Sequence, residues 1–280
     1  MTGAATRTRC VRAGAVQISY LEAGAGPPLA LLHGIGSAAA SFWNQLEELS
    51  ARFRVVAWDA PGYGASTALG VEQPAANNYA AALDDWLDAL GIARCHLLGH
   101  SLGSLIAARF AAEHPERVIT LTLAGVARGH GHLPPPQRER LLAQRLDDLA
   151  DLGPHGMAAK RGPRLLGPEA TEAMRRMVVE TMALIHPKGY AQAARMLSIG
   201  DIMADLARLR AGLPIQVIVG DADLITPPAG CLEIAAACRA AATQVIPGAG
   251  HALYLEKPRE FNRLLADFTT ANGLNHLAML

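Results

Sequence analysis

The chain has 280 residues, of which 51% are hydrophobic and 18% charged, a composition that excludes a disordered protein. Its 25 basic and 25 acidic residues give a formal net charge of zero, so no overall charge would hold nucleic acid or an anionic membrane. No apolar run reaches the roughly 18 residues of a membrane span, and the N-terminus lacks a secretory signal pattern. Four cysteines without a C-x-x-C pair indicate neither a disulfide framework nor a metal site. We therefore expect a soluble, cytoplasmic globular protein.

Short apolar segments alternate with amphipathic segments through the first 125 residues and again after residue 213. Two extended segments, at 9–12 and 16–22, are separated by a glycine-containing turn and predict a hairpin. The following apolar runs lack polar alternation and are typical of strands buried on both faces: 29–32, 55–58, 96–98, 118–123 and 215–219. Helices are predicted at 41–51, 79–90, 102–113 and 229–238. This alternation predicts an α/β protein with a mostly parallel sheet and helices on both faces.

The alternation stops between residues 126 and 213, where the sequence has helical segments and prolines but no convincing strand. It resumes with strands at 215–219 and 243–246 and a last helix at 258–270. We therefore expect a core formed by residues 1–125 and 214–280, with a helical lid inserted at 126–213.

The charge of the expected lid differs from that of the core. The lid has 13 Lys and Arg against 9 Asp and Glu, a net +4, and the rest of the chain has 12 against 16, a net −4. The lid also contains six of the eight methionines. Such helices form either a solvated layer with a methionine-packed underside or a cationic lid that attracts an anionic substrate to an adaptable pocket.

A candidate nucleophile lies between a predicted strand and a predicted helix. Residues 99–103 read Gly-His-Ser-Leu-Gly and fit the pattern G-x-S-x-G. A sharp turn between strand and helix lifts the Ser101 hydroxyl clear of the sheet, and glycines allow the backbone to approach closely there. The helix that begins at Leu102 directs its positive end toward an oxyanion. Since serine is a weak nucleophile, the site also needs a base and a carboxylate that orients it.

The base and the acid are expected after the last two strands. His251 follows the strand at 243–246 and is the candidate base. Asp221 and Asp223 both follow the strand at 215–219. Asp223 lies further into the loop, where it can reach the histidine, whereas Asp221 abuts the strand and is better placed to brace the turn. The chain order serine, acid, histidine is the one used when the serine occupies such a strand–helix turn.

The loop after the strand at 29–32 is the candidate for stabilising negative charge. It reads His33-Gly34-Ile35-Gly36, and its glycines allow backbone N–H groups to point into the site. The N–H groups of Ile35 and Leu102 would together form a two-donor oxyanion hole. His33 is expected to brace this loop rather than to act chemically.

With these motifs and the turn at 59–66, the chain resembles the α/β-hydrolase superfamily over essentially its whole length. The resemblance implies an eight-stranded sheet, Asp223 as the acid, and no metal or organic cofactor. Within the superfamily the chain is similar to enol-lactonases, small carboxylesterases and C–C bond hydrolases. Its short oxyanion loop favours ester or lactone substrates, such as an anionic enol-lactone of aromatic catabolism. Serine at position 101 argues against haloalkane dehalogenases and epoxide hydrolases, whose nucleophile is aspartate.

Other functions remain open from the sequence. A C–C bond hydrolase acting on a vinylogous 1,5-diketone is the main alternative, and a ligand receptor without turnover or a lyase on the same scaffold belongs to other classes. A dinucleotide-binding fold is excluded because residues 34–39 lack the third glycine. We expect a small-molecule substrate, no nucleic acid or membrane partner, and a monomer or homodimer. The residues expected to contact the substrate are Gly34, His100, Phe42, Trp43, Arg128 and His130.

Overall fold

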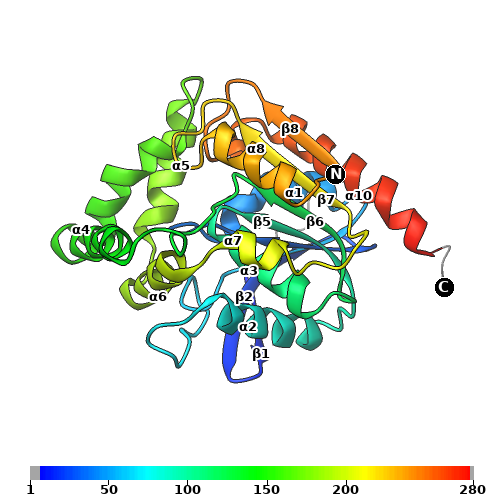
Figure 1. The fold of residues 1–280 in the computed structure, drawn as a ribbon, viewed down its shortest axis with the longest axis horizontal. Coiled ribbons are helices and arrows are strands. Elements are labelled where there is room, and N and C mark those ends of the chain that lie inside the picture. Colours follow the sequence, from blue (N-terminus) through cyan, green and yellow to red (C-terminus); the bar gives the residue numbers. More distant parts are fainter. Residues whose placement is uncertain (1–6, 278–280) are drawn as a thin grey trace.

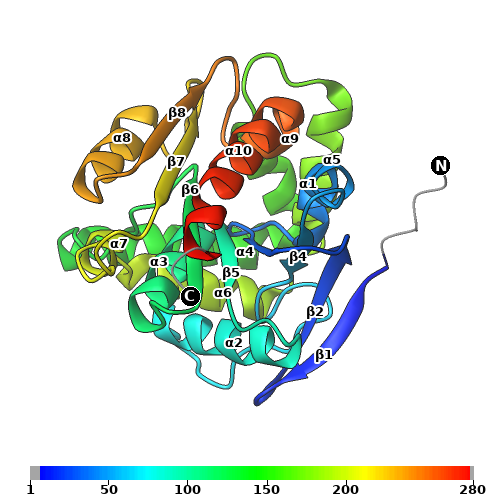
Figure 2. The same ribbon diagram turned by 90° about the vertical axis from the view of Figure 1, so that its right-hand side faces the viewer.

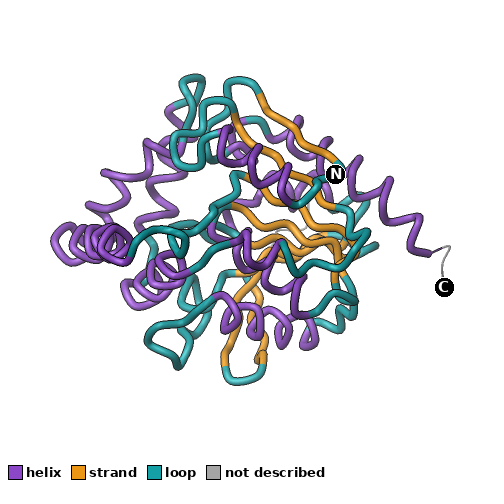
Figure 3. Tube along the Cα trace, viewed as in Figure 1, coloured by secondary structure: helices purple, strands orange, loops and turns teal. Residues whose placement is uncertain are grey.

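The computed structural model describes residues 7–277, in which one sheet runs through the centre (Figure 3). The sheet has eight strands in the order β1-β2-β4-β3-β5-β6-β7-β8. Strand β2 is antiparallel to both β1 and β4, and all other neighbours are parallel, as the alternation of apolar segments predicts. The strands are β1 (Arg9–Ala13), β2 (Val16–Ala23), β3 (Pro28–Leu32), β4 (Arg54–Trp58), β5 (Cys95–His100), β6 (Val118–Ala124), β7 (Ile215–Gly220) and β8 (Ala242–Ile246).

Helices cover both faces of this sheet, so the central strands are buried on both sides. In β3, Leu29 and Leu31 join one hydrophobic cluster, whereas Ala30 and Leu32 join the other, because successive side chains of a strand point to opposite faces. Figure 2 shows the helices of the two faces on opposite sides of the sheet. One face carries α2 (Ala76–Ala89), α3 (Leu102–Glu113) and α8 (Pro228–Ala237), and the other carries the short helices η1 (Ala39–Phe42) and α9 (Leu253–Glu256) with α1 (Trp43–Leu49) and α10 (Pro258–Leu277).

The segment between β6 and β7 is helical and lies mostly outside these two layers. It contains α4 (Pro135–Arg161), η2 (Gly162–Leu165), α5 (Glu172–Ala183), α6 (Pro187–Ile199) and α7 (Ile202–Leu206). Figure 1 shows α4, α5 and α6 together at one end of the sheet. A kink at Gly153, which has a φ of 60° and precedes Pro154, divides α4. The last helix, α7, instead packs on α3, and Asp205 pairs with Arg109 at 2.9 Å.

The parallel strands place their carboxyl ends along the same edge of the sheet. Pairing aligns Leu32 of β3 with Gly99 of β5, and Gly220 of β7 with Ile246 of β8. Loops far apart in the sequence therefore meet at this edge, where ligands bind in open α/β sheets. The candidate site described below lies at this edge. Within residues 7–277, no helix has both the length and the apolar character that a membrane span requires.

Candidate active site

The turn between β5 and α3 holds Ser101 in a strained backbone conformation. Its φ is 53° and its ψ −116°, values that place a residue with a side chain in the left-handed region. The N–H of Ser101 donates to the Ala124 carbonyl at 2.9 Å, which ties the turn to β6. A Cβ atom on Gly99 would come closer than 3.0 Å to the backbone of Gly103, and one on Gly103 equally close to the backbone of Leu32. Glycine at both positions therefore lets helix, turn and strand pack closely enough to present the serine side chain.

His251 is held by a buried carboxylate from the neighbouring loop. Its Nδ1 lies 2.8 Å from Asp223 Oδ2, and both side chains are almost completely buried. The other carboxylate oxygen accepts the N–H groups of Ile225 and Thr226 at 2.8 and 2.9 Å. Burial opposes ionisation of Asp223, but the bonds from His251 and Thr226 outweigh it and lower the pKa of the carboxyl. An ionised Asp223 keeps the proton of His251 on Nδ1 and leaves Nε2 free to accept one.

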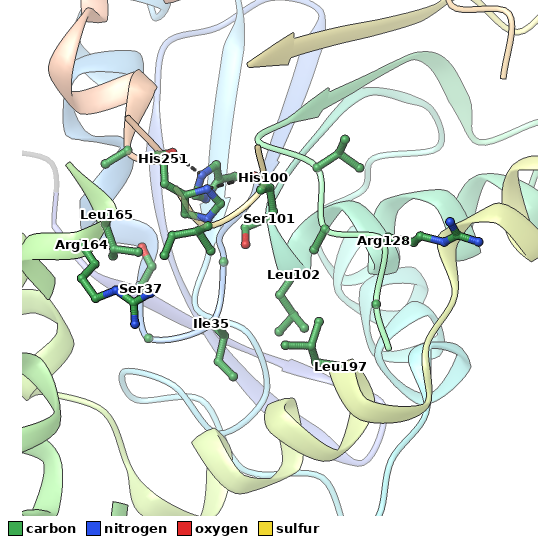
Figure 4. A pocket seen from close by; sticks show the side chains of 18 of the residues that line it. Ile35, Ser37, His100, Ser101, Leu102, Arg128, Arg164, Leu165, Leu197 and His251 are labelled. Carbon is green, nitrogen blue, oxygen red and sulfur yellow. Dashed lines mark hydrogen bonds between the residues drawn. The ribbon is translucent and has the colours of Figure 1, made fainter. Parts of the chain in front are cut away.

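The second acid of this loop has a different contact. Asp221 Oδ1 accepts the N–H of Gly248 at 2.7 Å and so braces the turn after β8. It forms no hydrogen bond to His251, whose only carboxylate partner among residues 7–277 is Asp223. The Ser101 hydroxyl forms no hydrogen bond to His251 in the described structure, although both residues line one cavity (Figure 4). In a free site this bond is often absent and forms with the substrate.

Two backbone N–H groups are available beside Ser101. The N–H groups of Ile35 and Leu102 donate to no acceptor within the described part of the chain, and both residues line the same cavity. His33 supports the loop that carries Ile35: its Nε2 accepts the N–H of Ala60 at 3.0 Å, and its ring packs on Tyr63. Free backbone donors beside a serine hydroxyl have the geometry that an oxyanion site requires.

His100 supports His251 from the other side. Its Nε2 donates to the His251 carbonyl oxygen at 2.9 Å, and its ring packs against those of His251 and Tyr254. Burial and the neighbouring His251 lower the pKa of His100 to about 3, so the ring is neutral at physiological pH. With the proton on Nε2, Nδ1 is an acceptor, and it has no partner in the described structure.

The cavity around these groups measures about 350 Å³ and extends under the inserted helices. Of the residues expected to contact substrate, Gly34, His100, Arg128 and His130 line it. Phe42 and Trp43, also expected to contact substrate, do not line the cavity. Phe42 is fully buried against Tyr254 at 5.0 Å between ring centres, because η1 packs on α9. Trp43 begins α1 on its outer side and is 45% exposed.

Several residues of the site were not predicted from the sequence. Thr226 donates its hydroxyl to Asp223 Oδ2 at 2.8 Å, and its position three residues after an aspartate is a recognisable turn signal. Arg145, Arg161 and Arg164 line the cavity from the inserted helices. No local pattern distinguishes them from the other basic residues of that segment, because only packing decides which of them face the cavity.

A comparison with known families agrees with this geometry. The sequence model of the family described as "alpha/beta hydrolase fold" matches residues 27–258, most of the chain. The chain belongs to the α/β-hydrolase family. Its similarity extends to RutD of Shigella flexneri, named for a proposed carbamate hydrolase activity, at 32% identity over 263 residues, covering 90% of this chain and 92% of RutD. These findings support a hydrolytic activity.

Solved structures of other α/β-hydrolases are similar over nearly the whole chain. The enol-lactonase from Burkholderia xenovorans LB400 superposes with a TM-score of 0.83 at 23% identity, covering 94% of this chain and 100% of that one. The thermophilic esterase from Thermogutta terrifontis superposes with a TM-score of 0.80 at 25% identity, covering 95% and 98%. The eight-stranded fold is therefore shared.

We expect the folded state to lose stability in mild acid, because three of its histidines are buried. Burial lowers the pKa of His33, that of His96 to about 4 and that of His100 to about 3. The unfolded chain binds protons at these histidines near pH 6.5, but the folded chain does not. Their contribution to the free energy of unfolding is therefore complete above pH 6.5. It decreases as the pH falls below that value, by up to about 1.4 kcal/mol per histidine and pH unit.

Urea unfolding at pH 7, 6 and 5 measures this loss. Asp205 and Glu256 act in the opposite direction, because burial raises the pKa of both carboxyls. The His96→Gln variant isolates one histidine, since His96 bonds Thr120 on β6 and does not line the cavity. Its unfolding free energy should decline less steeply with acid than that of the wild type. Equal slopes for the two proteins would contradict the prediction.

Proposed function

We propose that the protein is a serine hydrolase that cleaves a small carboxylic ester or lactone through an acyl-enzyme on Ser101. The observation that carries the proposal is the Asp223–His251 pair at 2.8 Å, whose histidine lines the same cavity as Ser101 on its strained turn. The names given to the similar RutD protein and to the Thermogutta esterase both denote hydrolytic reactions and support the reaction type. The assignment of an ester or lactone follows from the short oxyanion loop.

In the proposed mechanism, His251 Nε2 takes the proton of Ser101 as Oγ attacks the carbonyl carbon. The N–H groups of Ile35 and Leu102 stabilise the oxyanion, each by about 3 kcal/mol in comparable enzymes. The tetrahedral intermediate collapses, the C–O bond breaks, and the leaving alkoxide takes the proton from His251. Water, deprotonated by His251, then releases the acid from Ser101. For a lactone the alcohol and the acid belong to one product.

We assign the lid role to the helices inserted between the core segments 1–125 and 214–280. The support is that α4, α5 and α6 contribute Arg145, Met182 and Tyr190 to the cavity that contains Ser101. Walls of this kind exclude water and select the substrate. The methionine Met182 also lies against Gly36 of the loop that carries Ile35.

A turnover assay on a panel of p-nitrophenyl esters and other substrates tests the function. Acetate to octanoate esters, an enol-lactone, an aryl carbamate and a vinylogous 1,5-diketone form the substrate panel, with Ser101→Ala as the control. We expect multiple turnover of an ester or lactone and an acyl adduct on Ser101 by peptide mass spectrometry, both absent in Ser101→Ala. Turnover of the diketone alone would indicate the C–C hydrolase. Folded protein without turnover on any substrate would instead favour a receptor or a lyase.

A further inference from the structure

The charged side chains around the cavity are strongly asymmetric. Arg128, Arg145, Arg161 and Arg164 line it, whereas Glu233 is the one carboxylate among the residues that line it. All four arginines come from the segment between β6 and β7, and the apolar residues of the lining include Leu165, Val178 and Met182. A guanidinium group in a partly apolar cavity attracts an anionic ligand more strongly than one in open water.

Three of the four arginines already have protein partners. Arg161 forms an ion pair with Asp148, and Arg145 donates to the Tyr190 hydroxyl at 3.3 Å. Arg128 lies 3.6 Å from an Asp201 oxygen, and Figure 4 shows its side chain pointing away from Ser101. An arginine engaged in this way has fewer N–H groups left for a ligand.

Arg164 differs from these three. It forms no ion pair or hydrogen bond with any residue of the described structure, and its side chain is exposed. In Figure 4 its guanidinium projects from η2 toward the loop that carries Ser37, on the side of Ser101 opposite Arg128. Its N–H groups are therefore free to bind a ligand at the His251 side of the cavity.

The backbone that carries Arg164 is attached to the loop of the proposed base. The N–H of Ala252 donates to the Leu165 carbonyl at 2.8 Å. The buried Glu256 carboxylate accepts the N–H of Gly167 at 2.7 Å through one oxygen and that of Gly250 at 3.0 Å through the other. The end of η2 is therefore bonded directly to Ala252, and the following Gly167 is linked to Gly250 through the Glu256 carboxylate, on the two sides of His251. The backbone that carries Arg164 is thus fixed in position relative to His251. A side chain that selects a substrate needs such a fixed position.

We propose that Arg164 binds a carboxylate of the substrate, so that the hydrolysed ester or lactone is a small anion with its charged group near Ser37. This inference rests on the proposed function and adds its substrate class. The planar guanidinium offers two parallel N–H groups to the two oxygens of a carboxylate. The carboxylate is bound and takes no part in the bond cleavage at Ser101.

Two matched esters test this role. One is the mono-p-nitrophenyl ester of glutarate, and the other is a neutral ester of the same shape, in which an isopropyl group replaces the carboxylate. We expect Arg164→Gln to lower kcat/KM for the anionic ester about 10- to 100-fold more than for the neutral ester. Arg164→Lys should recover part of the preference, because it restores the charge without the paired N–H groups. Arg140→Gln, an exposed inserted-helix arginine outside the cavity lining, is the control.

The outcomes separate this inference from the proposed function. Equal losses on both esters, or an unchanged preference, would overturn the role of Arg164 while Ser101-dependent turnover of the neutral ester still supported the hydrolase. A second measurement needs no turnover: glutarate should raise the Tm of Ser101→Ala and should do so much less when Arg164→Gln is added. Glutarate that stabilises both proteins equally would overturn the inference even if no ester were hydrolysed.

Discussion

Replacement of Asp223 by asparagine is expected to lower kcat about 10⁴-fold without unfolding the protein. The carboxylate oxygen Oδ1 accepts two backbone N–H groups, from Ile225 and Thr226, and the amide oxygen of asparagine would take that position. Its NH₂ group would then face His251 Nδ1, where Asp223 Oδ2 lies now. An N–H donor at this place moves the imidazole proton to Nε2. His251 could then no longer accept the proton of Ser101.

Steady-state kinetics on the best ester of the panel measure this loss, with circular dichroism as the check on folding. Asp221→Asn is the matched control, since Asp221 accepts only the Gly248 N–H in the described structure and an amide oxygen can replace it. We expect that variant to change kcat little. A large loss in Asp221→Asn together with a small one in Asp223→Asn would reverse the assignment of the two acids. The double variant Ser101→Ala/Asp223→Asn should lose no more than Ser101→Ala alone, far less than the product of the two single losses, because the residues act as one unit.

Alanine at Gly103 is expected to destabilise the folded state by about 3 kcal/mol or more. The added Cβ would come closer than 3.0 Å to the Leu32 carbonyl group and to the His33 carbonyl oxygen. These atoms belong to β3 and to the loop after it, so neither can move without displacing the sheet or Ile35. The first turn of α3 would have to move instead, and with it the N–H of Leu102. We therefore expect activity to fall together with stability.

Urea unfolding of Gly103→Ala, Gly99→Ala and Gly70→Ala tests this packing. At Gly99 the added Cβ would meet the Gly103 carbonyl group, whereas at Gly70 no heavy atom lies within 4 Å of it. Gly70→Ala should be as stable as the wild type or slightly more stable, because alanine restricts the unfolded chain. Failure of Gly103→Ala to fold would agree with the prediction. Wild-type stability of that variant, with an unchanged m-value, would contradict it.

Much of this protein could be predicted from local sequence signals. Apolar runs without alternation predicted the central strands, and the strand–turn–helix pattern at 99–103 predicted the position and sharpness of the turn at Ser101. The two aspartates after β7 were distinguished by their distance from the strand end, and only Asp223 bonds to His251. These signals are reliable because each depends on the backbone of a few consecutive residues.

The contacts of side chains on the helices could not be predicted in this way. Phe42 and Trp43 follow the loop at 33–36 closely in the chain, yet η1 directs one into the core and α1 exposes the other. The expected lid has 13 basic residues, and no periodicity distinguishes Arg164 from the rest. Its place in the cavity depends on Glu256 and Ala252, roughly ninety residues later, which bond to the segment after it. The sequence by itself thus determined the strands, the turn and the chain order of Ser101, Asp223 and His251. Only the tertiary structure decided which side chains surround the cavity, because that choice rests on packing between segments distant in the chain.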